Sequence, residues 1–275
     1  MADPIYLIKD SQRAVRMDPQ PYVSEDEFQE LLGRFPELLA GEQVDRENPR
    51  RWLLVAREIG IPDSENAGGR WSLDHLFVDQ DGIPTLIEVK RQSDSRLRRE
   101  VVGQVLDYAA NAARFWPGSY LQQRFEKTCQ EAERNPSEVL GRFLETQDQD
   151  PAAFWLAVEG RLRDGDMRLI FLADEVPLEL QRIVEFLNSQ MTKTEVLAIE
   201  VRRYSGEGYS THVPRLLGQT AEAQVAKGAS RASSQRRKWD DASFFSAAAP
   251  LPESTKDALR KLFLLASSPG LLLAA

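Results

Sequence analysis

Apolar residues near the start of the chain recur at the spacing of an amphipathic helix. The pattern lies within residues 24–39, where Ser24 and Glu27 have the three-residue spacing of a capping box at a helix N-terminus. Its apolar positions are Phe28, Leu31, Leu32 and Phe35. A short strand is expected before it, at Ile5–Ile8. Residues 50–59 are apolar enough for a strand or a short helix, and their pattern does not choose between the two.

Two apolar runs between residues 71 and 90 flank the dipeptide Asp81-Gly82. This arrangement predicts a β-hairpin whose turn centres on that dipeptide. A helix is expected next, over about residues 95–115, because apolar positions again recur at helical spacing. The stripe consists of Val101, Val102, Val105, Leu106, Ala109 and Ala113.

The second half of the chain alternates between helical and strand patterns. Two or three helices are expected first, with breaks near Asn135-Pro136 and Asp150-Pro151. A buried strand follows at 167–176, then a helix from Pro177 to about Met191 and a strand at Glu195–Arg203. Because a strand–helix–strand unit joins parallel strands by a crossover, parallel pairing is predicted for part of the sheet.

The 275 residues are enough for one or two domains. We expect an irregular N-terminal segment at 1–20 and one α/β domain at 21–204. That domain has a central mixed sheet flanked by helices and a helical insertion at about 117–163. Residues 205–248 are rich in Gly, Ser, Ala and Gln, which is typical of a flexible linker. A C-terminal extension at 249–275 is expected to form a helical tail.

Composition narrows the class of protein. The formal net charge of −8 argues against non-specific coating of nucleic acid, although a local basic patch could still bind phosphates. The single cysteine excludes an intramolecular disulfide framework, and Cys129, His75 and His212 are too scattered for a structural zinc site. No apolar run approaches the ~18 residues needed to span a bilayer, and the N-terminus is not signal-like. A cytoplasmic protein that does not contact membranes is therefore expected.

The predicted hairpin gathers charged side chains at its open end. Antiparallel pairing about the Asp81-Gly82 turn places Asp74 opposite about Val89. Glu88 and Lys90 are two positions apart and share a face. Two carboxylates beside one ammonium suit Mg²⁺ or Mn²⁺, with the Val89 carbonyl as a further ligand. Lys90 would orient or help to deprotonate a water, or offset phosphate charge. The alternative is an exposed strand end at which the charges add only solubility.

Three further features fit the same chemistry, and each has a structural alternative. Gln104 and Tyr108 are one helical turn apart and would contact a phosphate or a water, or else face solvent. Glu25 is a third candidate carboxylate, or it only interacts with the helix dipole. Basic residues before the 95–115 helix suit a nucleic-acid backbone, or they form a solvated helix start. These are Arg91, Arg96, Arg98 and Arg99.

Asp74, then Glu88-Val89-Lys90, then Gln104 with Tyr108, resembles the PD-(D/E)XK nuclease superfamily, in particular its RecB-type subgroup. The segments Glu25–Gln29 and Pro36–Leu39 are similar to the N-terminal helix of uncharacterised proteins related to the mismatch-specific endonucleases. The resemblance covers about residues 24–204.

The resemblance implies a restriction endonuclease-like core with a metal-dependent active site. Asp74 and Glu88 would ligate the metal, Lys90 would be catalytic and Glu25 would assist the metal or a water. Gln104 and Tyr108 would line the site. Two departures matter. His75 occupies a position that is usually apolar, so it is either harmless or reaches the site. Pro62-Asp63 offers a competing Pro-Asp pair, but Asp63 lies in a loop, so Asp74 is preferred.

These observations lead to a nuclease hypothesis with two alternatives. The first is a Mg²⁺- or Mn²⁺-dependent phosphodiesterase that acts on nucleic acid, and DNA ranks above RNA only through the resemblance. The second is a nucleic-acid-binding or protein-interaction module on the same fold, without cleavage. The third is a defence effector nuclease that a ligand activates. A homodimer is expected only by analogy with relatives of this fold. No Gly-x-Ser-x-Gly, Walker A or dinucleotide motif is present.

Overall fold

The protein is an α/β fold built on a mixed β-sheet. In the computed structural model, the sheet order is β1 (Ile5–Lys9), β2 (Arg13–Gln20), β7 (Glu195–Gly206), β6 (Arg168–Ala173), β5 (Pro84–Lys90), β4 (Trp71–Asp79) and β3 (Trp52–Ile61), with β8 (Tyr209–Leu217) also paired to β7. The structure describes residues 3–9, 13–62, 71–91, 100–145 and 150–219, which all fall within one compact unit, Met1–Ser230.

The centre of the sheet is parallel and its flanks are antiparallel. Strands β5, β6 and β7 run parallel, which confirms the pairing predicted from the strand–helix–strand pattern. Strands β3, β4 and β5 form an antiparallel meander. The ambiguous segment at 50–59 therefore belongs to a strand, β3. Its pairing with β4 and its packing against a helix decide the conformation that its apolar pattern left open.

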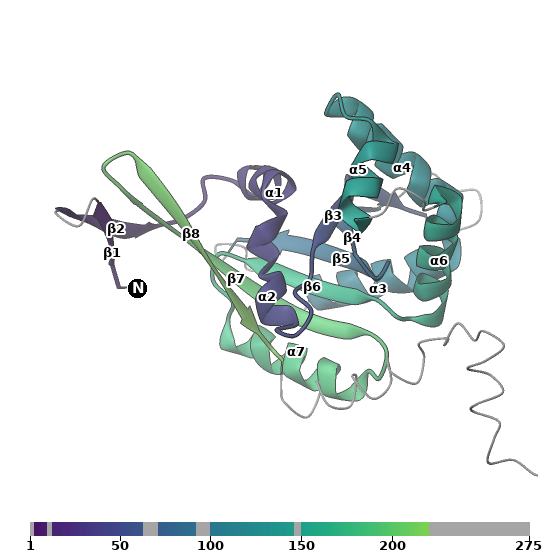
Figure 1. Cartoon of the computed structure of the whole chain (residues 1–275). Helices are drawn as coiled ribbons and strands as arrows, with labels where there is room; N and C mark the ends of the chain where they lie inside the picture. The colour runs from purple at the N-terminus through teal and green to yellow at the C-terminus, as the bar shows by residue number, and fades with distance from the viewer. Residues whose placement is uncertain (1–2, 10–12, 63–70, 92–99, 146–149, 220–275) are drawn as a thin grey trace, which may run out of the picture. The chain divides into compact units, whose positions relative to one another are not determined.

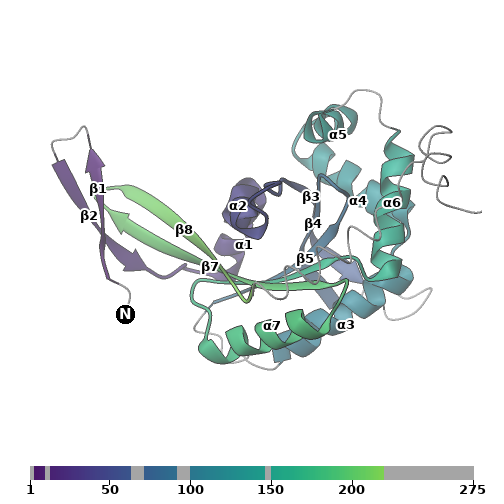
Figure 2. The same cartoon turned by 60° about the horizontal axis from the view of Figure 1, so that its bottom comes forward.

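Helices cover both faces of the sheet (Figures 1 and 2). Helix α1 (Glu25–Arg34), the short 3₁₀ helix η1 (Pro36–Leu39) and α2 (Gly41–Val44) lie on one face. The other face carries α3 (Glu100–Phe115), α4 (Gly118–Glu131), α5 (Pro136–Leu144), α6 (Pro151–Asp164) and α7 (Leu178–Gln190). Each face has its own apolar core, so a strand residue's position in the alternation decides which core it joins.

Helix termini follow the capping residues in the sequence. The Ser24 hydroxyl accepts a hydrogen bond from the Glu27 amide at 3.0 Å, as the capping box predicts, while the Glu27 carboxylate accepts from the Val23 amide. Asn135 and Asp150 cap α5 and α6, at the two breaks expected in the helical insertion. None of the helices in the described ranges is long and apolar enough to cross a membrane.

Two domain boundaries expected from composition are wrong. Residues 205–217 are not linker, because β7 continues to Gly206 and pairs with β8 from Ala198 to Gly206. The described part of residues 1–20 is not irregular: the strand expected at Ile5–Ile8 is confirmed as β1, residues 13–20 form β2, and Asp18–Gln20 pair with β7. Figure 1 shows these strands extending past α1. The rest of the expected linker from 220, and the 249–275 tail, lie outside the described residues.

The β4–β5 hairpin has a three-residue turn, one residue longer than expected. Asp79 and Ile83 close it, and Gly82 adopts a φ of 74°, in the left-handed region that glycine tolerates. The register is therefore shifted by one residue from the expected one. His75 lies opposite Ile87, and Asp74 consequently lies opposite Glu88. Because a one-residue shift in register exchanges the two faces, it places Asp74 on the face of Glu88, whereas the expected register would have placed it on the face of Val89.

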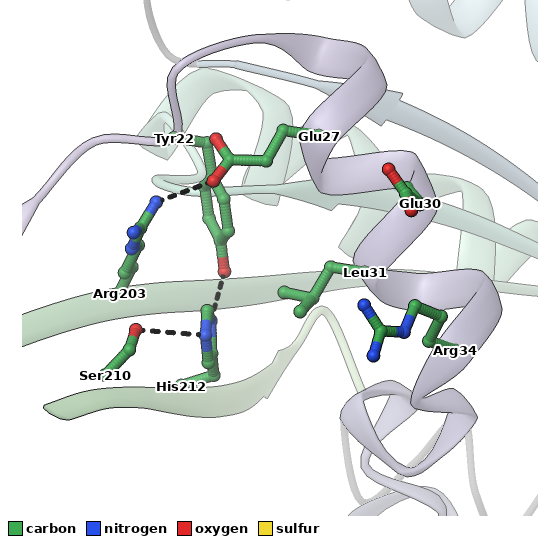
Figure 3. Close-up of a pocket in the computed structure, with 8 residues that line it drawn as sticks. All are labelled: Tyr22, Glu27, Glu30, Leu31, Arg34, Arg203, Ser210 and His212. Atoms are coloured by element: carbon green, nitrogen blue, oxygen red, sulfur yellow. Dashed lines mark hydrogen bonds and ion pairs between the residues drawn. The ribbon is translucent and has the colours of Figure 1, made fainter.

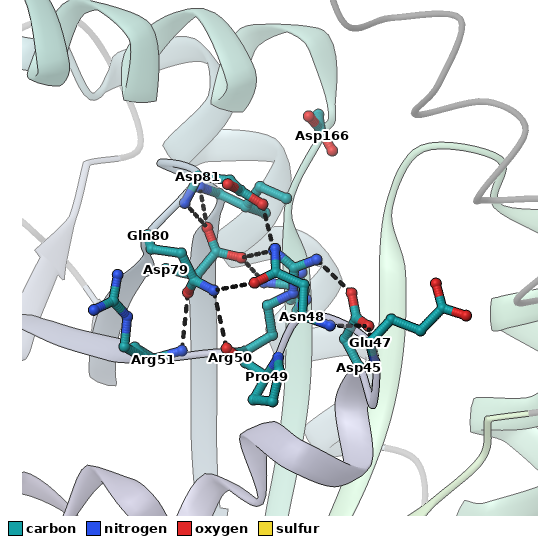
Figure 4. Close-up of polar contacts among 12 residues, drawn as sticks. Asp45, Glu47, Asn48, Pro49, Arg50, Arg51, Asp79, Gln80, Asp81 and Asp166 are labelled. Atoms are coloured by element: carbon teal, nitrogen blue, oxygen red, sulfur yellow. Dashed lines mark hydrogen bonds and ion pairs between the residues drawn. The ribbon is translucent and has the colours of Figure 1, made fainter. Parts of the chain in front are cut away.

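A buried ionic network fixes the turn end of this hairpin. The Asp79 carboxylate is fully buried and accepts hydrogen bonds from the Asp81 and Ile83 amides and from the Arg168 guanidinium. Arg168 is also fully buried and donates to Glu195 at 2.6 Å. Figure 4 shows Arg50 extending into the same network from the loop before β3. The network ties β4, β6 and β7 together at the end opposite to the candidate site.

Candidate functional site

The predicted charged residues converge at the C-terminal end of β5. Asp74 of β4 and Glu88 and Lys90 of β5 share the face covered by α3, while His75 and Val89 face the core beneath α1. Glu25 stands at the start of α1, on the other face of the sheet. Its side chain nevertheless reaches Lys90, so the site is built from both faces at one edge.

Lys90 lies at the centre of this group. Its Nζ is 2.8 Å from Glu25 Oε1, 3.0 Å from Glu88 Oε1 and 3.9 Å from Asp74 Oδ2. It also donates to the Val89 carbonyl at 2.9 Å. We call these four side chains, Glu25, Asp74, Glu88 and Lys90, the Lys90 cluster. Burial lowers the pKa of Lys90, but the charges of Glu88 and Asp74 outweigh it, so that the pKa lies above its usual range and the ammonium stays charged.

The two inner carboxylates are held in a poorly solvated place. Glu88 is 1% exposed, and burial together with the Asp74 charge raises its pKa to about 7. Burial likewise raises the pKa of Asp74 to about 6, against the opposing effects of Lys90 and of the 2.7 Å hydrogen bond from the Val89 amide. Near neutral pH the pair therefore holds less than its full negative charge unless a cation joins it.

Gln104 and Tyr108 of α3 belong to the site. The Gln104 amide donates to Glu88 Oε1 at 2.9 Å and to the Tyr108 hydroxyl at 2.8 Å. Tyr108 is 3% exposed and packs in the core, so the alternative in which these residues face solvent is wrong. Burial raises the pKa of Tyr108, which keeps its hydroxyl protonated. Gln104 thus fixes one oxygen of Glu88, and the other oxygen has no hydrogen-bond partner among the residues that the structure describes.

His75 does not reach the Lys90 cluster. It is fully buried on the opposite face, where its Nε2 lies 3.0 Å from the Gln29 carbonyl of α1. Burial, helped by the positive charge of Arg57, lowers its pKa to about 3. His75 therefore anchors α1 to β4 as a neutral ring, and this contact holds the helix that carries Glu25.

His75→Phe is expected to change the acid sensitivity of the fold. At pH 7 the variant should be about 1 kcal/mol less stable, because one buried hydrogen bond is lost. Below about pH 6.5, His75 becomes protonated in the unfolded wild type but stays neutral in the folded protein. The free energy of unfolding of the wild type therefore decreases as the pH falls. At about pH 4.5 this costs roughly 2–3 kcal/mol, so the variant should become the more stable protein. Urea unfolding of both proteins across this range would show the crossing, and parallel curves would contradict it.

Of the four arginines predicted to form a basic patch, only Arg91 falls within the described residues. The Arg91 guanidinium donates to the Val23 carbonyl at 2.9 Å, which places it just before α1 and beside the Lys90 cluster. Arg96, Arg98 and Arg99 lie outside the described residues, as does the competing Asp63. The described ranges therefore place one of the four arginines near the site.

The carboxylates of Asp74 and Glu88 are the candidate ligands for a divalent cation. Among the described residues, no group of three or more His, Cys, Asp and Glu side chains is arranged to hold a metal ion. Two neighbouring carboxylates are, however, the protein ligands that Mg²⁺ commonly uses with water and substrate phosphate. Glu88 Oε2 is buried and has no hydrogen-bond partner within the described ranges. An orphaned carboxylate oxygen beside Asp74 fits a cation ligand, whereas the Val89 carbonyl already accepts from Lys90.

Comparisons with protein families, with curated proteins and with solved structures give no match to this chain. Functional interpretation therefore depends on the geometry of the Lys90 cluster.

Proposed function

We propose that the protein is a metal-dependent nuclease with a restriction endonuclease-like core, and that it hydrolyses phosphodiester bonds in DNA. The observation that carries the proposal is the Lys90 cluster, in which an ammonium meets the buried Glu88 and the partly buried Asp74 at the C-terminal end of β5, beside a Glu88 oxygen that has no hydrogen-bond partner among the described residues. Buried charges with strongly shifted pKa values are typical of catalytic sites. The choice of DNA is supported by the sequence resemblance.

Each residue has a distinct task in this proposal. Asp74 and Glu88 would hold Mg²⁺ or Mn²⁺, which when bound activates water and stabilises charge on a phosphate. Lys90, kept protonated by its neighbours, places a positive charge where a phosphate gains negative charge. Glu25 holds the ammonium in position from α1. Gln104 orients Glu88 through one oxygen and leaves the second available.

Cleavage should require both a divalent cation and Lys90. We expect linear single-stranded, double-stranded or mismatched DNA to be cut with Mg²⁺ or Mn²⁺ and to stay intact with EDTA. Lys90→Ala should lower the rate by roughly 100-fold or more, because a preorganised charge is lost. Gel analysis of end-labelled substrates measures both effects.

The matched control is Lys127→Ala, which removes an exposed lysine of α4 whose partner among the described residues is Glu131. It should cleave like the wild type. Full activity of Lys90→Ala would contradict the assigned role of Lys90. Metal-independent DNA binding without cleavage by any of the proteins would favour the non-catalytic binding module instead.

A further inference from the structure

A pocket lies on the far side of α1 from the Lys90 cluster. It is a pocket of about 290 Å³ between α1 and the paired strands β7 and β8 (Figure 3). Small-molecule sites usually begin at about 300 Å³. The pocket therefore suits one small ligand, and it is too small for an extended oligomer to be enclosed.

Hydrogen-bonding groups line the strand side of this pocket. His212 Nδ1 lies 2.9 Å from the buried Tyr22 hydroxyl, and its Nε2 lies 3.3 Å from Ser210 Oγ. Arg203 stands beside them on β7 and pairs with Glu27 through a single nitrogen. The Arg203 Nε atom is buried without a hydrogen-bond partner among the described residues. Both ring nitrogens of His212 are engaged, so the imidazole holds the Ser210 hydroxyl in place, and this hydroxyl beside the Arg203 guanidinium is a donor set that suits a phosphate.

The helix side has a different chemistry. Leu31 points from α1 toward the strands and offers an apolar surface, and Glu30 and Arg34, one turn apart, lie along the same helix in Figure 3. Arg34 makes no ion pair within the described ranges, and its guanidinium lies over the Phe35 ring. An arginine of this kind can stack on a flat aromatic ring. Glu30 is exposed and can accept hydrogen bonds from amino or hydroxyl groups.

The lining discriminates against simpler ligands. A purely apolar ligand would desolvate the Arg203–Glu27 ion pair and the charges of Glu30 and Arg34 without offering them a hydrogen bond, and a small anion alone would occupy only the strand side of the pocket. A nucleotide combines a phosphate, a flat ring and hydrogen-bond donors in one small molecule, and the pocket offers residues that suit each of these groups. We propose that this pocket binds one nucleoside monophosphate unit. Its phosphate lies at Arg203, Ser210 and His212, its base packs over Leu31 beside Arg34, and its donors face Glu30.

Nucleotide binding in this pocket does not depend on nuclease activity and can be measured in its absence. Calorimetry in EDTA with AMP, GMP, CMP and dTMP should show one-to-one binding of at least one nucleotide. The matching nucleoside and inorganic phosphate should each bind at least about tenfold more weakly, because each fills only one half of the pocket. Absence of saturable binding by every nucleotide at millimolar concentration would overturn the proposal.

Two variants and two controls locate the binding. Ser210→Asp puts a negative charge at the phosphate end and Arg34→Ala removes the base contact; each should weaken binding by at least about tenfold. Val213→Asp and Arg215→Ala make matching charge changes on the opposite face of β8 and should leave binding unchanged. Equal affinity in Ser210→Asp, Arg34→Ala and wild type would place the nucleotide elsewhere and reject the pocket.

The nucleotide could be free or could be the end of a strand. A short 5′-phosphorylated oligonucleotide that displaces the mononucleotide, and that is itself weakened by Ser210→Asp, would identify a strand-end site. Binding of mononucleotides alone would identify a free-nucleotide site. Both results support the chemistry proposed for the pocket.

Discussion

Glu88→Gln should abolish cleavage and at the same time make the metal-free protein more stable at pH 8. The expected loss of activity is about 100-fold or more, because a neutral amide is a poor ligand for a divalent cation and leaves Asp74 alone. The expected gain in the free energy of unfolding is about 1–3 kcal/mol. Opposite effects on activity and stability are typical of a site whose charges are held together for function.

The gain in stability follows from the pKa of Glu88. Burial and the Asp74 charge raise it from 4.5 to about 7 in the folded protein. Between these values the folded state binds more protons than the unfolded state, so stability falls as pH rises through this range. The full penalty is present above about pH 7. Replacement by the neutral, similarly shaped Gln removes the penalty and keeps a hydrogen-bonding partner for Gln104.

Urea unfolding in EDTA at pH 5, 6, 7 and 8 would test this. The two proteins should be similar near pH 5 and should separate as the pH rises. Glu42→Gln, at an exposed position on α2, is the control and should follow the wild type at every pH. A variant that is less stable than the wild type at pH 8 would mean that the attraction between Glu88 and Lys90 outweighs the cost of burying the carboxylate.

Most of the Lys90 cluster could be predicted because it depends on short-range patterns. The two-residue spacing of Glu88 and Lys90 fixes a shared strand face, and the hairpin brings Asp74 to the same end of the strands. The register differs from the expected one by one residue, and this difference puts Asp74 on the face of Glu88 rather than that of Val89. The i, i+4 spacing places Gln104 beside Tyr108 on one helix face. The position of Glu25 was suggested by the resemblance, since nothing local shows that α1 crosses the sheet edge to reach Lys90.

The remaining features depend on contacts between distant segments. Strand β8 is polar and half exposed, so its sequence has a linker composition, and only its pairing with β7 makes it a strand. The same holds for β2, which pairs with residues of β7 that lie about 185 positions later in the sequence. The pocket between α1 and strands β7 and β8 joins Tyr22, Arg203 and His212 in the same manner. His75 carried a visible signal, a polar ring among apolar neighbours, but its partner Gln29 could not be identified from periodicity.

Asp79→Ala should be the most destabilising of the substitutions considered, with a loss of about 3–5 kcal/mol in the free energy of unfolding. The reason is that the substitution leaves the buried Arg168 without one of its charged partners. Arg168 is fully buried, and Asp79 and Glu195 are the two carboxylates that neutralise and hydrogen-bond its guanidinium. Removal of one partner from a buried ionic network leaves an uncompensated charge, which costs far more than the pair contributes.

The neighbouring Asp81 provides the control. It lies two residues away in the same turn and pairs with Arg50, but its side chain is 45% exposed. Asp81→Ala should therefore cost less than about 1 kcal/mol. Asp79→Asn separates charge from turn geometry, because an amide oxygen can still accept from the Asp81 and Ile83 amides. If Asp79→Asn is as stable as the wild type, the carboxylate acts through the turn alone. If it is as unstable as Asp79→Ala, the charge on Arg168 dominates, and the end of the sheet opposite the Lys90 cluster is held by electrostatics.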